Sequence, residues 1–127
     1  MSVTVTSSVI GDRNEITTVT SNAATADVDA LAEVFTITNT KEDMLIVIGG
    51  TGSSADGDIS YSFAAGEMWN SKVISGTVTK NTEKVICVDT ANCKKADGTI
   101  ALTLTPAATD KLLTDHAAYV KVIENVG

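Results

Sequence analysis

The chain has 127 residues, of which 43% are apolar, 20% charged and 4% aromatic, and its formal net charge is −7. This length suits one domain with enough chain to bury a core without disulfides or a metal. Thr, Val and Ile make up roughly a third of the residues, and their β-branched side chains favour pleated sheet. The composition predicts an all-β domain and argues against a coiled coil, a collagen-like chain and a transmembrane protein.

Short runs of alternating apolar and polar side chains, separated by Gly-, Asp- and Asn-containing turns, predict strands along the whole chain. In chain order the predicted strands are 2–10, a weaker 15–20, 30–38 with the best alternation from Val34 onward, 44–48, 59–63, 72–79, 83–89, 99–105 and 119–124. The segments 21–29 and 49–58 are expected to be loops, and 107–116 a short helix or a turn. About eight or nine short strands predict a single β-sandwich, or a jelly-roll-like fold, over residues 1–127.

Alternation within these strands predicts which side chains face the core. In 59–63 and in 99–105 the large apolar residues stand at alternate positions and therefore share one face of each strand. Phe35 and Ile37 likewise share one face of their strand. The unbroken apolar run 44–48 predicts a strand that is covered on both faces. Gly76 marks a bulge or a close contact inside its strand. The expected inward residues of the two alternating strands are Ile59, Tyr61, Phe63, Ile100, Leu102 and Leu104.

The first ten residues leave two alternatives open. Their uncharged alternation predicts either a strand of the protein's own sheet or an extended N-terminal arm that adds to the edge of a neighbour's sheet. The second alternative makes Val3, Val5 and Val9 candidate interface residues. The same segment lacks the basic start and continuous apolar core of a signal peptide, so secretion by that route is not expected.

Charge is unevenly distributed along the chain. Residues 1–71 carry ten acids against Arg13 and Lys41, a net of −8, whereas residues 72–127 carry seven lysines against six acids, a net of +1. An acidic chain with nine basic residues lacks the clustered cations that phosphate backbones and anionic membranes require. We therefore expect neither nucleic acid nor membrane as a partner.

The two cysteines form no disulfide framework, which would need four or more in so short a chain. Cys87 lies in the apolar run 85–88 and is expected in the core, whereas Cys93 lies in a polar turn and is expected to be partly exposed. Reduced thiols are the expectation, and a bridge between the two remains open. With a single histidine in the chain, the pattern does not fit a zinc site.

No residue set predicts catalysis. His116 has Asp110 and Asp115 nearby in sequence, but proximity within one short segment is expected without any triad. Asp56 and Asp58 could hold a calcium ion only weakly, because the remaining ligands of a calcium loop are missing. We therefore expect no enzyme activity, no cofactor and no metal.

Met68 and Trp69 interrupt the alternation beside a turn and are the remaining candidate interface residues, since Trp and Met are enriched where proteins meet. The aromatic cluster that runs from Tyr61 to Trp69 has two other interpretations. Tyr61 and Phe63 share the inward parity of Ile59, which predicts core positions. An exposed cluster would instead suit sugar stacking.

The stretch from Val85 to Thr105 resembles a known family, the small β-sandwich head decoration (cement) proteins of tailed bacteriophages. The pieces that carry the resemblance are Asp89-Thr90-Ala91, Lys95-Ala96-Asp97-Gly98-Thr99-Ile100 with the strand that runs into Pro106, Phe63-Ala64-Ala65-Gly66 and the terminal strand Val120–Val122. Asn92-Cys93 departs from the family, where a bulky apolar residue is expected, and puts any partner contact made there in doubt.

This resemblance implies a structural virion protein without catalytic residues. Such a protein is made in the host cytoplasm, binds the major capsid protein on the outside of the expanded shell, often as a trimer, and stabilises it. Many weak identical contacts suffice for this role, because a symmetric array multiplies them. The alternative is a carbohydrate-binding or adhesin-like sandwich on a virion or a cell surface.

Overall fold

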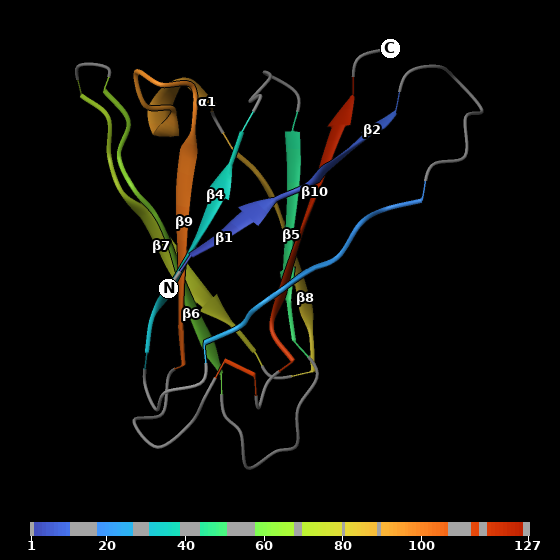
Figure 1. Cartoon of the computed structure of the whole chain (residues 1–127). Helices are drawn as coiled ribbons and strands as arrows, with labels where there is room; N and C mark the ends of the chain where they lie inside the picture. Colours follow the sequence, from blue (N-terminus) through green and yellow to red (C-terminus); the bar gives the residue numbers. More distant parts are fainter. Residues whose placement is uncertain are drawn as a thin grey trace.

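Two β-sheets pack face to face in the computed structural model (Figure 1). It describes residues 2–10, 18–26, 31–38, 44–50, 58–67, 70–79, 81–88, 90–106, 113–114 and 117–125. The strands are β1 (Ser2–Val5), β2 (Ser7–Ile10), β3 (Asn22–Ala23), β4 (Glu33–Ile37), β5 (Met44–Gly49), β6 (Ile59–Phe63), β7 (Ile74–Val78), β8 (Glu83–Cys87), β9 (Ile100–Pro106) and β10 (Tyr119–Asn125), and one helical turn, α1 (Thr90–Cys93), precedes β9. The all-β sandwich predicted from composition and alternation is confirmed.

The first sheet has the strand order β1-β4-β9-β6-β7, and the second has β2-β10-β5-β8 with the short β3 also paired to β10. β1 runs parallel to β4 and β2 parallel to β10, and the other pairings are antiparallel. On each of the two open sides of the sandwich, the edge strand of one sheet is followed in the chain by the edge strand of the other sheet. The chain passes from β1 to β2 at Thr6, and from β7, which ends at Val78, to β8, which begins at Glu83 (Figure 1).

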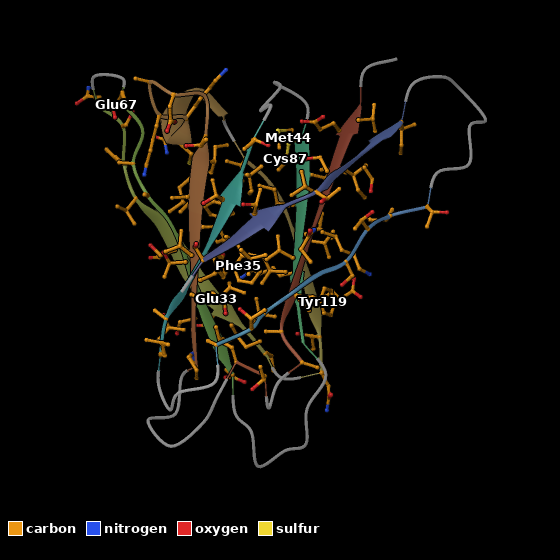
Figure 2. All side chains as sticks on the ribbon, in the orientation of Figure 1. Glu33, Phe35, Met44, Glu67, Cys87 and Tyr119 are labelled. Carbon is orange, nitrogen blue, oxygen red and sulfur yellow. The ribbon has the colours of Figure 1, made fainter. Side chains whose placement is uncertain are left out.

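The core lies between the sheets and follows the predicted parity. The expected inward residues of β4, β6 and β9 are all buried, and Figure 2 shows Phe35 between the sheets. Fully burying one large apolar side chain contributes about 1.5–3 kcal/mol, so these positions dominate the stability. The fully buried large side chains are Phe35, Phe63, Ile37, Met44, Ile46, Ile48, Ile59, Ile100, Leu102, Leu104 and Leu113.

The apolar run in β5 is covered on both faces only in part. Ile46 and Ile48 point into the core, and Val47, on the outward face, is only 7% exposed. Leu45, on that same outward face, is 42% exposed. The central position of β5, between β10 and β8, explains the apolar run, but the prediction of full cover is wrong at Leu45.

The described residues contain ten strands where eight or nine were predicted. The first predicted strand is divided at Thr6, and Asn22–Ala23 form a strand in a segment predicted to be a loop. The helical turn α1 forms at 90–93, where only a polar turn was predicted. Within 107–116, residues 113–114 form a turn, and the rest of that predicted helix or turn lies outside the described residues, as do residues 15–17 of the weak second strand.

The first ten residues adopt the first of their two alternatives. β1 and β2 pair within the chain's own sheets, and the side chain of Asn22 holds the crossing between them. The Thr6 N–H donates to Asn22 Oδ1 (2.8 Å), and Asn22 Nδ2 donates to the carbonyls of Thr6 (3.3 Å) and Val120 (2.9 Å). The amide thus replaces a strand partner at the residue where the chain leaves one sheet for the other.

Glu33 is fully buried at the start of β4, and its carboxylate organises the chain that enters the sandwich. Oε2 accepts the N–H of Ala26 (2.6 Å) and of Thr25 (2.9 Å), and Oε1 accepts the Thr25 hydroxyl (2.7 Å). These hydrogen bonds replace the water that the carboxylate loses on burial, and they hold residues 25 and 26 against the core.

The two cysteines are free and exchange their predicted environments. Cys87 is exposed and Cys93 is fully buried. β8 lies at a sheet edge, and only the parity of Ile86 and Val88 faces inward, so the apolar run places Cys87 outward. Cys93 ends α1, whose single turn carries it into the core. The prediction was wrong because an apolar run does not reveal parity at an edge.

Gly76 makes a close contact, one of its two predicted roles. A Cβ placed at Gly76 would lie 2.5 Å from Tyr61 Oη, on the neighbouring strand β6. The absence of a side chain at Gly76 therefore leaves room for the hydroxyl end of the Tyr61 ring.

Candidate protein-contact surface

The outward face of the second sheet presents three rows of side chains. Strand register aligns residues of β10, β5 and β8 across the sheet, and residues so paired point to the same side. The rows are Ile123, Leu45 and Cys87, then Lys121, Val47 and Val85, then Tyr119, Gly49 and Glu83. Apolar side chains therefore fill the first two rows except at Lys121, and the third row is polar.

Five of these side chains form what we call the outer patch: Leu45, Val47, Val85, Cys87 and Ile123. Leu45 is 42% exposed and Val85 is 59% exposed, although both are large and apolar. Of the other three, Cys87 is exposed, Ile123 is half-buried and Val47 is only 7% exposed. Single exposed apolar residues are ordinary, whereas a group of them on one sheet face is typical of surfaces that contact another molecule. Because the patch spans three hydrogen-bonded strands, its shape is fixed before any partner binds.

A hydrogen-bonded group borders the outer patch. The Tyr119 hydroxyl donates to Glu83 Oε1 (2.6 Å) across the sheet. Lys121 Nζ lies 4.9 Å from the centre of the Tyr119 ring, which permits a cation–π attraction. The ring crosses over Gly49, where an added Cβ would lie 2.5 Å from the Tyr119 hydroxyl oxygen. The absence of a side chain at Gly49 thus allows this bridge, and a polar border beside an apolar centre is the usual anatomy of a protein interface.

Partial burial and Glu83 together set the proton affinity of Tyr119. Desolvation by burial, then the hydrogen bond and negative charge of Glu83, raise the pKa of the Tyr119 phenol from 10.0 to about 12. The phenol remains a neutral donor throughout the physiological range, so this border is constant there.

The outward face of the first sheet is chemically different. Its paired rows carry mostly small hydroxyl side chains and no charged residue. The members are Ser2, Thr4, Val34, Thr36, Ala101, Thr103, Thr105, Ser60, Ser62, Ser75 and Thr77. The two outward faces of the sandwich therefore offer a hydroxyl surface and an apolar surface, and the latter is better suited to a dry protein contact.

The structure describes three of the predicted interface residues, and their environments differ. Val5 is 3% exposed within the core, Val3 packs against that core, and Val9 is 43% exposed on β2. Val5 is therefore part of the protein's own core. Met68 and Trp69 lie outside the described residues, as do His116, Asp110 and Asp115 of the weighed triad and Asp56 of the weighed calcium pair.

The Asn92-Cys93 departure from the decoration family has a structural role. Asn92 Oδ1 accepts the Lys72 N–H (2.9 Å), and Asn92 Nδ2 donates to the Lys72 carbonyl (2.8 Å). The Asn92 carbonyl also accepts the Gly66 N–H (2.7 Å). Asn92 thus bonds Gly66 and Lys72, which lie on either side of residues 68–69 in the sequence, and Cys93 packs in the core.

Sequence reasoning missed the outer patch and its border. The run 44–48 hides the outward parity of Leu45, and β8 and β10 carry only ordinary strand patterns. The available signal was Gly49, a glycine that ends an apolar strand where a ring crosses it.

Three further observations bear on the function. Phe35, Tyr61 and Phe63 are core residues, so they form no sugar-stacking platform. Among the described residues, no group of three or more His, Cys, Asp or Glu is placed to hold a metal ion. No helix in the described part of the chain has the length and apolarity that a bilayer crossing requires.

Comparisons with protein-family models, with curated proteins and with solved structures find no match to this chain.

Proposed function

We propose that this protein is a structural virion protein that binds the outside of a tailed-bacteriophage capsid and stabilises it. Its partner is the major capsid protein, and its place is the capsid exterior after synthesis in the host cytoplasm. The observation that carries the proposal is the outer patch, an exposed apolar surface on a rigid sheet with a polar border. The resemblance of residues 85–105 to decoration proteins supports the same role.

The size of the outer patch suits this role. Standard stable interfaces bury roughly 800 Å² on each partner, whereas the patch exposes parts of only a few side chains. One such contact is weak by itself. On a capsid the same contact is repeated at every equivalent position, and linked copies gain affinity by avidity.

The net charge of −7 supports the proposal in a second way. A free acidic subunit is repelled by nucleic acid and remains dispersed in the infected cell by charge repulsion. Among the described residues, the charges that share this face with the apolar patch are Lys121 and Glu83, one of each sign, so docking here adds little net charge from them to the contact.

The test is cosedimentation with expanded, undecorated capsids of the phage that encodes the chain. Wild-type protein is expected to bind saturably, at a fixed ratio to capsid subunits, and to raise the temperature at which the capsids disrupt. Leu45→Lys places a charge in the centre of the outer patch and is expected to weaken binding roughly tenfold or more, because about 1.4 kcal/mol lost in the contact is already tenfold.

Val73→Lys is the matched control, since Val73 is 60% exposed and lies off the outer patch. It is expected to bind as the wild type does. Unimpaired binding of a folded Leu45→Lys protein would show that the outer patch is not the contact, and absence of wild-type binding would refute the function.

A further inference from the structure

Within the part of the chain that the structure describes, β8 is an open sheet edge. It is the last strand of the second sheet and pairs on one side with β5. Four of its five side chains are exposed, and Ile86 is half-buried. The strand contains neither Pro nor Gly, the residues that commonly interrupt pairing at an edge.

The other three edges of the sandwich are modified or occupied. On β2, Ser8 Oγ accepts the Thr20 N–H (2.9 Å), so a neighbouring segment lies beside that strand. β1 continues directly into the crossing at Thr6, where Asn22 is bound. β7 contains Gly76, and its Thr77 carbonyl accepts Lys84 Nζ (3.5 Å).

The one lysine of β8 is directed away from the edge. Lys84 belongs to the inward parity, and its Nζ lies 5.3 Å from the centre of the Tyr61 ring as well as near the Thr77 carbonyl. An edge lysine usually discourages pairing with another chain. Here the ammonium group instead spans the side of the sandwich between β8 and β7. The residue at the middle of the β8 edge is Val85, which is 59% exposed.

We propose that β8 pairs antiparallel with β8 of a second copy of this chain, about a two-fold axis at Val85. This register places Val85 opposite Val85, Lys84 opposite Ile86 and Glu83 opposite Cys87. All opposed residues have the same parity. Alternate residues of β8 direct their backbone N–H and C=O groups toward the free edge. Because each of them lies opposite a residue of the same parity, these groups meet in pairs and form hydrogen bonds between the two copies.

Charge and chemistry favour a second copy as the occupant. No two like charges stand directly opposite in this register, and the central contact is apolar, which is the arrangement that stabilises cross-strand pairs. The half of the chain that supplies β8 and β10 carries a net +1, against −8 for the first 71 residues. Pairing here joins the least acidic part of one copy to the least acidic part of the other.

Pairing at this edge leaves the outward face free and places two outer patches side by side on one continuous sheet. The pairing does not depend on the proposed function. If both hold, the paired patch is the larger docking surface. The resemblance to decoration proteins implies trimers, whereas a self-complementary edge gives a two-fold contact, so the mass in solution separates the two.

Charge swapping at position 85 tests the two-fold contact without any capsid. Wild-type mass by sedimentation is expected to rise with concentration toward twice 13.1 kDa, and Val85→Lys and Val85→Glu are each expected to remain monomeric, because like charges then face each other. An equal mixture of these two variants is expected to regain the double mass. Val73→Lys, changed at an equally exposed valine, is expected to associate as the wild type does.

A cross-link gives an independent readout. In a Cys87→Ser background, Val85→Cys is expected to form a disulfide dimer under a mild oxidant, since directly opposed residues have Cβ atoms about 4.5–5.5 Å apart. Val73→Cys in the same background is the control and is expected to cross-link far less.

Several outcomes would overturn the pairing: a wild-type mass that stays single up to millimolar concentrations, a triple mass, a Lys–Glu mixture that does not associate, or equal cross-linking of the two cysteine variants. Capsid binding by a protein that stays monomeric would refute the pairing alone. A dimer that fails to bind capsids would refute the function alone.

Discussion

The side-chain amide of Asn22 bonds both backbone groups of Thr6, taking the place of a neighbouring strand at the single residue where the chain passes between the sheets. Asn92 does the same for Lys72 on the surface. The two amides differ in burial, since Asn22 is 8% exposed and the contacts of Asn92 with Lys72 are exposed, and Asn22 also donates to the buried Val120 carbonyl. They therefore form a natural pair for measuring what such a contact contributes.

Asn22→Ala is expected to lower the free energy of unfolding by about 2–3 kcal/mol, because it leaves the buried Val120 carbonyl and the partly buried backbone groups of Thr6 without their partner. Asn92→Ala is expected to cost about 1 kcal/mol or less, because water replaces an exposed partner. Urea unfolding of both variants measures the difference. Equal losses would show that burial does not control the contribution of these amides.

Glu33→Ala is expected to lower the free energy of unfolding by about 3 kcal/mol or more. The change leaves the buried Ala26 N–H and the partly buried donors of Thr25 without an acceptor, and hydrogen bonds to a charged group contribute about 1.5–3 kcal/mol each. Glu33→Gln keeps one acceptor oxygen and is expected to cost less. Glu67→Ala is the control, because Glu67 is exposed and lies toward the other end of the sandwich (Figure 2). A loss no larger than that of the control would contradict the assigned role.

The Tyr119 phenol is expected to titrate near pH 12, the value to which burial and Glu83 raise its pKa. Glu83→Gln removes the negative charge and is expected to move the pKa back toward 10.0. Phenolate absorbance follows the titration, and its loss in Tyr119→Phe separates this signal from that of Tyr61. An unchanged midpoint in Glu83→Gln would mean that Glu83 does not affect the phenol.

The same pKa predicts how stability depends on alkali. The folded state holds the Tyr119 proton more tightly than the unfolded state, so the stabilisation from this group is fully present below pH 10 and is lost as the pH rises toward 12. Tyr119→Phe cannot ionise and is expected to lack this part of the decline. Parallel denaturation curves of the two proteins between these pH values measure it.

Cys87 is expected to react with a maleimide in the folded protein, and Cys93 only after unfolding, because accessibility controls the reaction of a thiol. Mass spectrometry should therefore find one label per native chain and a second in denaturant. Cys87→Ser is expected to abolish the native label, and a rapid second label in folded protein would contradict the burial of Cys93.

Local alternation predicted the burial of side chains in strands that have one covered face. The inward residues of β6 and β9 follow from simple alternation, because each strand has one covered face. The order of the strands in the sheets could not be predicted in this way. The outward exposure of Cys87 depends on β8 being an edge strand. Leu45 and Val47 share the outward face of β5 but are 42% and 7% exposed, and the unbroken apolar run does not distinguish them.

The contacts that fasten the chain depend on residues far apart in sequence. Nothing around Asn22 indicates that its amide binds Thr6 and Val120, and a glutamate at the start of β4 reads as a solvated residue. The polar border of the outer patch likewise needs Tyr119 and Glu83 to meet across Gly49. Only the glycine signals its role locally, by ending an apolar run.

The parallel pairing of β2 with residues 122–125 has a consequence for biosynthesis. β2 leaves the ribosome early, but its partner β10 is translated more than a hundred residues later. The strands of the first sheet all precede residue 107, so that sheet can assemble first on the nascent chain. The second sheet must wait for β10, which bonds β2, β3 and β5, so folding is expected to finish only after β10 has emerged.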